Sequence, residues 1–326
     1  MSIIQAELKQ YKAAVNDDTS ANGGLMSASE ITHNVKNNVF PDVSQEDRTA
    51  GVTQYRKVFH KVENDNDLTL STALVRMTEQ AEGDDRVTIF SGTQSDTQAD
   101  ISSPDEFGIA ALKNDVSGGA TSLVVTLEDS SQVIFYSTAG KNMVWIGNGT
   151  VEEFHDGVTI SKSGDEVTIT LAGGDSLTNS FLASNTVVAS VLEVGDILCS
   201  EDNWVDASAV YDESTYPLTH DNIGCIEETW TITISADGTS FTCSGATVGA
   251  VDSGNVSTDF SPINSDFNKP YFTLDKDGWS GQGEGDVIQF QTHPASAAVW
   301  RKRIVPAGAA AVSSEDYVIK TKGQTA

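Results

Sequence analysis

Positive charge is scarce in this sequence. Its 326 residues contain 19 lysines and arginines against 47 aspartates and glutamates, which gives a formal net charge of −28. Specific binding to nucleic acid relies on clustered cations that release counterions from phosphates. We therefore expect no specific nucleic-acid binding. The same charge keeps copies of the chain soluble, and it is typical of a saline environment in which salt screens the repulsion.

Long hydrophobic runs are also absent. Apolar segments such as residues 307–312 are far shorter than the roughly 20 residues that a membrane-spanning helix needs. The opening MSIIQAELKQ has neither the apolar core nor the small-residue cleavage site of a secretory signal. We expect a soluble chain made in the cytoplasm, with no membrane partner and with about two or three domains.

Cysteine is rare, and its spacing fits no known site. The sequence has three cysteines, Cys199, Cys225 and Cys243, and no C-x-x-C pair. This spacing excludes zinc-ribbon and thioredoxin-like motifs. Cys243 alternates with polar residues in a strand pattern, so we expect a small buried apolar side chain there. Nothing in the sequence requires a disulfide.

Motifs for catalysis are missing as well. The histidines are His33, His60, His155, His220 and His293. They form neither H-E-x-x-H nor any i, i+4 pair, and the sequence has no G-x-S-x-G. His155 and His220 precede Asp156 and Asp221, so an isolated Asp–His pair stays open, while His60 should point out of its strand. We expect no enzyme, and no catalytic, cofactor-binding or metal-binding residues.

One glycine-rich stretch, GWSGQGEGD at residues 278–286, could cradle a phosphate or bend the chain. A dinucleotide fingerprint needs a helix after its glycines, but residues 286–293 follow as a strand pattern. We therefore predict a turn between strands. The acidic residues around it do not match EF-hand spacing, so a calcium site is not expected; they are Asp275, Asp277, Glu284 and Asp286.

What the sequence has in abundance is strand pattern. Residues 53–62, 67–77 and 86–92 are rich in β-branched and aromatic residues. Residues 158–171 and 230–245 alternate around Ser-Gly-Asp and Asp-Gly turns, which predicts two hairpins. In the second, Trp230, Ile232 and Ile234 share one face and threonines occupy the other. The pattern predicts a mainly β chain, built as a β-sandwich or barrel.

The first 50 residues are the least β-like. Ile4, Leu8, Tyr11 and Val15 fit a helix, although Ile4, Ala6 and Leu8 also alternate, so both structures stay open. Residues 16–24 have the composition of a loop or arm, and we expect the part around Asn22 to Gly24 to be mobile in a free subunit and ordered in an assembled one. Short helices are predicted after Ser29 and, from a capping box, after Ser44.

Composition suggests three segments. We predict an N-terminal arm with the first part of a β-sandwich domain at 1–107, an inserted small β-barrel-like domain at 108–195, and the remainder of the sandwich at 196–326. The basic run at residues 301–303 fits either a solvated or salt-bridged strand edge or a contact to the acidic face of a neighbouring copy. Of the five tryptophans, Trp204 and Trp279 lie in loop patterns. They are the candidates for a sugar-binding platform, or for packing at a domain edge.

Several segments resemble proteins encoded among the virion structural genes of tailed bacteriophages and Mu-like prophages. They are residues 11–27, 37–65, 89–101, 221–234, 266–274 and 291–310. The resemblance covers most of the chain, but the middle section of this chain and its high acidity differ from those proteins. It implies a structural subunit without an active-site motif.

Within that class, the resemblance favours a tail protein. Tail tube and ring proteins are β-sandwiches that assemble into stacked rings, and a negative lumen lets DNA pass without sticking. We expect contacts with other copies and other virion proteins, and a location in the virion tail. A head–tail connector, a baseplate protein or a capsid-decoration protein is the alternative. From another class, the alternative is a carbohydrate-binding β-module or adhesin.

Overall fold

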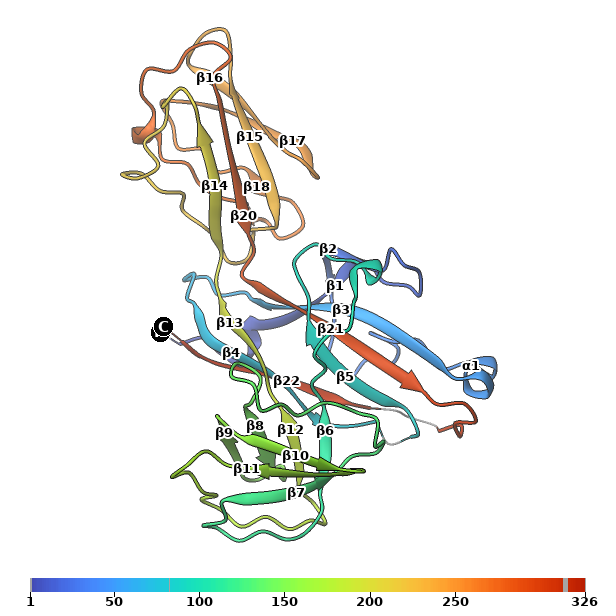
Figure 1. Cartoon of the computed structure of the whole chain (residues 1–326). Coiled ribbons are helices and arrows are strands. Elements are labelled where there is room, and N and C mark those ends of the chain that lie inside the picture. Colours follow the sequence, from blue (N-terminus) through green and yellow to red (C-terminus); the bar gives the residue numbers. More distant parts are fainter. Residues whose placement is uncertain (1, 82, 313–315, 326) are drawn as a thin grey trace.

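The structure, a computed structural model, describes residues 2–81, 83–312 and 316–325. It is mainly β, with antiparallel sheets throughout the described residues, so the predicted fold class is confirmed. Figure 1 shows three parts: a central part, an inserted part made of β6 to β12, and a distal part made of β14 to β20. None of the helices in the described ranges is long and apolar enough to cross a membrane.

The central part packs two sheets against each other. The larger sheet, in the order β2-β1-β3-β21-β5, contains β1 (Leu8–Val15), β2 (Gly23–Glu30), β3 (Val52–Val62), β21 (Ser296–Val305) and β5 (Arg86–Ser91). The smaller, in the order β13-β4-β22, contains β13 (Leu192–Ile197), β4 (Leu70–Glu79) and β22 (Val318–Thr325). Met77 of β4 and Val299 of β21 are fully buried in one core, because inward residues of both sheets alternate with outward ones.

The inserted part is one sheet around its own apolar core. Its order is β10-β11-β7-β6-β12-β8-β9, with β6 (Ile109–Leu112), β7 (Ser122–Thr126), β8 (Val144–Gly147), β9 (Glu152–His155), β10 (Thr159–Ser163), β11 (Glu166–Thr170) and β12 (Val187–Ser190). β10 pairs with β11, and Gly164 between them has φ 64°, which confirms the hairpin predicted at 158–171.

The distal part contains a five-stranded sheet. Its order is β14-β20-β15-β16-β17, with β14 (Ser200–Asp206), β15 (Glu228–Ile234), β16 (Ser240–Gly245), β17 (Gly249–Asn255) and β20 (Val287–His293). Trp230 pairs with Gly245 and Ile234 with Phe241, so the hairpin predicted at 230–245 is confirmed. The core beneath the sheet is aromatic: Phe272 lies 5.0 Å from the rings of both Trp230 and Phe290. Only one face of the sheet covers this core.

Small elements complete the chain. They are the helix α1 (Gln45–Ala50), the 3₁₀ turns η1 (Gln5–Glu7), η2 (Gln98–Asp100) and η3 (Lys276–Gly278), and the strands β18 (Ile263–Asn264) and β19 (Lys269–Pro270). α1 begins after Ser44, whose hydroxyl accepts from the Asp47 amide, as the capping box predicted. The helix predicted after Ser29 is wrong: β2 continues to Glu30, and Asn34 and Asn37 then adopt positive φ, which ends regular structure.

The N-terminal segment is a hairpin, and residues 16–22 are the loop between its strands. Strands β1 and β2 add to the edge of the central sheet, and the exposed loop between them is joined to β3 by Arg56, which donates to the Asp17 carbonyl and the Asp18 carboxylate. The side chain of Asn22 is fully buried and donates to the Tyr55 carbonyl at 2.8 Å. At Gly23, φ is 109° and an added Cβ would lie 2.8 Å from the Trp300 ring, so only glycine fits. Of the two predicted alternatives, a loop or an arm, the loop is confirmed, and its ordering on assembly stays a prediction.

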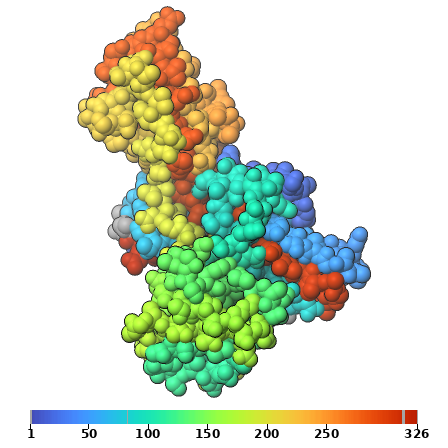
Figure 2. All heavy atoms as spheres, viewed as in Figure 1, coloured from blue at the N-terminus to red at the C-terminus, as the bar shows by residue number. Residues whose placement is uncertain are grey.

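The division into domains stays a prediction. The pairing of strands favours dividing the last of the predicted segments, 1–107, 108–195 and 196–326, once more. Ser200 pairs with His293, so the whole distal part lies in the sequence between two paired residues. We propose that residues 200–293 form a second insertion. Figure 2 shows that this part meets the rest of the molecule at a narrow neck.

Candidate functional site

The glycine-rich loop is a turn, as predicted. Gly281 and Gly285 have φ of 68° and 83°, conformations that glycine adopts at no steric cost. The Asp286 carboxylate closes the loop by accepting from the Gly283 amide at 2.7 Å and from the Ser208 hydroxyl at 2.6 Å. Both hydrogen bonds lower the pKa of Asp286, and the one from Ser208 has the larger effect. Among the described residues, no group of three or more His, Cys, Asp or Glu could hold a metal ion.

His155 and His220 pair with carboxylates, but not with the neighbouring aspartates that the sequence suggested. His155 lies between Glu153 at 3.1 Å and Asp175 at 2.7 Å, because β9 carries it to the side opposite Asp156. The carboxylates of the expected partners instead cap local turns and accept from nearby backbone amides; they are Asp156 and Asp221.

Two other histidine positions need separate mention. The ring of His220 lies 2.7 Å from Glu201. His60 does not point outward: it is buried and lies 2.7 Å from the Thr321 hydroxyl, because β22 covers that face of β3. Burial therefore lowers the pKa of His60 to about 3. No hydrogen bond joins the rings of His155, His220 or His293 to a Ser, Thr or Cys side chain within the described residues.

The basic run at 301–303 is internal. β21 lies between β3 and β5, so it is not a sheet edge. Arg301 donates to the Gln10 side chain at 2.6 Å, and Lys302 pairs with Glu106 at 2.6 Å. The guanidinium of Arg303 is buried and lies over the Phe40 ring at 4.7 Å. The predicted strand edge is therefore wrong, although the predicted salt bridge is present at Lys302, and the burial of Arg301 and Arg303 leaves them no surface for a contact to a neighbouring copy.

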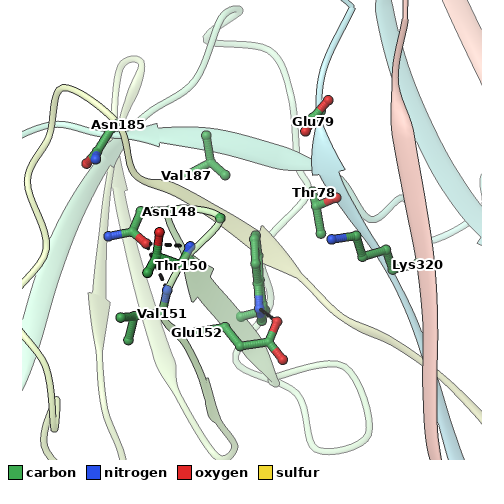
Figure 3. A pocket seen from close by; sticks show the side chains of 12 residues that line it. Thr78, Glu79, Asn148, Thr150, Val151, Glu152, Asn185, Val187 and Lys320 are labelled. Atoms are coloured by element: carbon green, nitrogen blue, oxygen red, sulfur yellow. Dashed lines mark hydrogen bonds between the residues drawn. The ribbon is translucent and has the colours of Figure 1, made fainter.

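A cavity of about 500 Å³ lies between the central and inserted parts. Figure 3 shows Thr78 and Lys320 on its central side and the turn with Asn148 and Thr150 opposite them. The Thr78 side chain is buried, and its hydroxyl has no partner in the described structure. Trp145 is only 4% exposed and donates to Glu152 at 2.9 Å, so its ring faces are not free to stack on a ligand.

The neck of the distal part is cross-linked. Cys199, directly before β14, forms a disulfide with Cys225 in the loop before β15. In the same loop, Asn222 donates to the Asp67 carboxylate at 2.8 Å and to the Leu68 carbonyl at 3.1 Å. The loop therefore rests on the central part, and the disulfide holds β14 to it.

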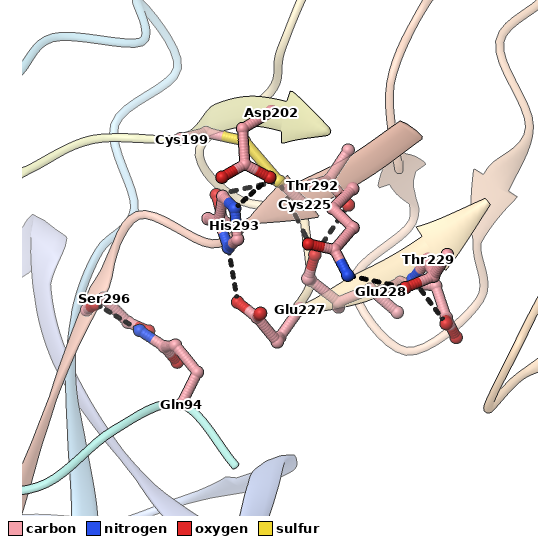
Figure 4. A network of polar contacts seen from close by, with 12 residues as sticks. Gln94, Cys199, Asp202, Cys225, Glu227, Glu228, Thr229, Thr292, His293 and Ser296 are labelled. Atoms are coloured by element: carbon pink, nitrogen blue, oxygen red, sulfur yellow. Dashed lines mark hydrogen bonds and ion pairs between the residues drawn. A yellow bond between two sulfur atoms is a disulfide. The ribbon is translucent and has the colours of Figure 1, made fainter. Parts of the chain in front are cut away.

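Figure 4 shows a polar cluster beside this disulfide. His293, the last residue of β20, lies 2.9 Å from Glu227 and 3.1 Å from Asp202 of β14. Burial alone would lower the pKa of His293, but the hydrogen bonds and charges of Glu227 and Asp202 raise it. The cluster ties β14, β20 and the start of β15 together at the base of the distal sheet.

Above this cluster, the sheet presents a broad face to solvent, which we call the outer face. Strand alternation points these side chains away from the core. The outer face consists of Asp202, Asn203, Val205, Thr229, Thr231, Thr233, Ser240, Thr242, Ser244, Ala250, Ser253, Asn255, Val287, Gln289 and Gln291. Asp202 is the single charged residue in this set, and it lies at the border, where His293, the next outward residue of β20, and Glu227 continue the same side of the sheet. In a chain of net charge −28, such a surface stands apart.

Hydrogen bonds between side chains order the outer face. Gln289 donates to the Thr231 hydroxyl at 3.1 Å, and Gln291 donates to the Thr229 hydroxyl at 3.0 Å. Asn203 donates to the Gln291 side chain at 2.6 Å. Because these contacts link three neighbouring strands, they hold long polar side chains in place against the sheet. The outer face is the candidate functional site.

Trp204 and Trp279 both pack inward, and Trp204 lies in β14, so the loop predicted around it is wrong. The Trp204 ring stacks on Phe290 at 5.0 Å, and the Trp279 ring stacks on Phe241 at 5.0 Å. Both contribute to the distal core, so neither is an exposed sugar-binding platform. The interpretation as packing residues holds, because aromatic rings gain most when their faces are covered.

Comparisons with known proteins add little. No family model matches the chain, and no curated protein matches it. Among solved structures, the chain is similar to the VP16–VP17 complex of the two major capsid proteins of bacteriophage P23-77, with 12% identity over 78% of this chain and 89% of that chain and a TM-score of 0.18. It is also similar to VP17, a capsid protein of the same phage, with 12% identity over 78% and 88% and a TM-score of 0.17. Scores this low carry no argument about fold or function.

Proposed function

We propose that the chain is a structural subunit of a bacteriophage virion, most simply a tail tube or ring protein that assembles with other copies and other virion proteins. The observation that carries the proposal is the outer face, a nearly uncharged surface on a strongly acidic chain. A monomer gains no solubility from such a surface, whereas an assembling subunit needs one place where copies can meet without like-charge repulsion.

The charge distribution supports the same function. Several lysine and arginine side chains are buried within the sheets and do not contribute to the surface: Arg56, Lys57, Lys61, Arg76, Arg301 and Arg303. Exposed lysines also pair with carboxylates, as Lys9 does with Glu30 at 3.1 Å. The remaining surface is therefore strongly negative, which suits a lumen through which DNA passes without binding. A capsid, connector or baseplate subunit would use the same surface and is the alternative within this class.

The carbohydrate-binding alternative has lost its main support. It depended on Trp204 and Trp279 as exposed platforms, and both rings are packed against phenylalanines. No second observation favours it.

The test is to locate the protein in a particle. The purified chain, concentrated at raised salt to screen its charge, should form rings, tubes or shell fragments in negative-stain electron micrographs. Antibodies against the chain should label virions, and the labelled part would decide between tail and capsid. A chain that stays monomeric under these conditions and is missing from purified virions would contradict the proposal.

A further inference from the structure

We propose that the outer face of the distal sheet docks onto the outer face of a second copy, in a two-fold contact. The inference rests on the proposed assembly function and deepens it by naming the partner. The outer face is the set of residues of β14, β15, β16, β17 and β20 defined above, and it lies at the end of the molecule farthest from the inserted part (Figure 1).

Charge selects the partner. A basic partner protein would be attracted to the acidic surface that covers most of the chain, not to the one face that lacks charge. Another copy carries the same net charge of −28 and is repelled everywhere else. Two like-charged copies can approach most easily where each presents few carboxylates, and on the outer face the single one, Asp202, lies at the border beside His293. The lack of charge on the outer face therefore favours a copy of the same chain over a cationic partner.

The face is also complementary to itself. A threonine hydroxyl and a glutamine amide each carry both a donor and an acceptor, so two identical faces can exchange hydrogen bonds in either direction. The Gln289 amide gives one hydrogen to Thr231, and its carbonyl oxygen has no partner in the described structure. A two-fold contact brings the same patch of both copies together, which requires this kind of self-complementarity.

Two valines provide an apolar anchor at one edge. Val205 is 54% exposed and Val287 is 39% exposed. They lie on the same face of neighbouring strands, because Val205 pairs with Gln289, two residues from Val287 along β20. Exposed apolar side chains that cluster on a sheet are typical of contact surfaces. Elsewhere on the face the hydroxyl and amide groups are arranged for hydrogen bonding.

The size of the face predicts weak pairwise binding. Five strands spaced about 4.8 Å apart, each about seven residues of about 3.4 Å, cover about 500 Å² per copy. Two faces together bury about 1,000 Å², at the lower limit of specific interfaces. Two isolated copies should therefore be mostly dissociated at micromolar concentration. The same contact should persist in an assembly, where many such contacts act together.

Charge insertion tests the proposal. The double variant Gln289→Glu, Thr242→Glu places two carboxylates on the outer face. The change at Gln289 is nearly isosteric. The matched control is Gln324→Glu, Thr159→Glu, which makes the same changes at exposed strand positions of the central and inserted parts. Sedimentation equilibrium up to about 1 mM protein should show at least about tenfold weaker association for the face variant and wild-type association for the control, since like charges oppose each other only in the face contact.

A cross-linking experiment provides a second test that does not depend on the folding of the charged variant. Thr231→Cys, near the centre of the face, should give covalent dimers with a short bis-maleimide, whereas Thr159→Cys should not. Cys243 does not interfere, because it is buried and burial raises the pKa of its thiol to about 12. Equal association of the folded face variant, or no Thr231→Cys dimer at the concentration where wild type associates, would overturn the proposal.

The outcomes separate this inference from the proposed function. If wild type and face variant both form particles equally well, the docking face is wrong and the assembly function stands. If wild type does not associate at about 1 mM and antibodies fail to label virions, both are wrong.

Discussion

Opening the Cys199–Cys225 disulfide should destabilise the distal part. The two cysteines are 26 residues apart in the sequence. A cross-link that closes a loop of this length removes conformational freedom from the unfolded chain, which corresponds to about 3.5 kcal/mol at 25 °C. The loss should be local, because the disulfide joins the start of β14 to the loop that carries Asn222, and this loop rests on the central part.

Urea unfolding measures this loss. Three of the five tryptophans, Trp204, Trp230 and Trp279, lie in the distal core, so most of the change in tryptophan fluorescence reports this part of the chain. With a slope of about 2 kcal/mol per molar urea, the midpoint of the Cys199→Ala, Cys225→Ala variant should fall by about 1.7 M. Cys243→Ala is the control: Cys243 is equally buried, but it forms no cross-link. A change below about 0.5 M, or one that the control matches, would refute the argument.

Three further predictions concern His293, Gly147 and Asn22. Because the pKa of His293 is raised from its ordinary 6.5, its charged form stabilises the fold below that pH, and the contribution is lost as pH rises through the folded-state pKa. Thermal melts between pH 5 and pH 9 should show that loss in wild type and not in His293→Gln. Gly147→Ala would place a Cβ 2.2 Å from the Trp145 ring and should cost about 1–3 kcal/mol, whereas Gly173→Ala, with nothing within 4 Å, should be neutral in the same melts. Asn22→Ala removes the hydrogen bonds from the Asn22 amide to the Tyr55 carbonyl and to the Gln98 side chain, and it should cost about 1–3 kcal/mol, with faster amide exchange in β1 and β2.

Local pattern was enough to predict the hairpins. In residues 230–245 the turn chemistry, the alternation and the pairing partner all lie within sixteen residues of sequence, so no distant contact could override them. The same is true of the helix after Ser44, whose cap lies within one turn. The threonines of β15 were also visible as the polar side of a strand.

Contacts between distant segments could not be predicted. Nothing near Asn22 in the sequence indicates that Tyr55 and Gln98 surround it. Arg301 and Arg303 look solvated because arginine usually is, yet the strand that carries them lies inside a sheet. The outer face combines Asn203 with Gln291, 88 residues away, so its lack of charge emerges only once the strands are paired.

The neck of the molecule has a practical consequence. Ser200 and His293 are paired neighbours, so the two points where the chain leaves and re-enters the central part lie side by side. A short turn could join Leu198 to Ser296 and remove everything between them. The same position could accept an unrelated module whose termini are adjacent. The central part is therefore a scaffold on which foreign proteins could be displayed as interchangeable cassettes.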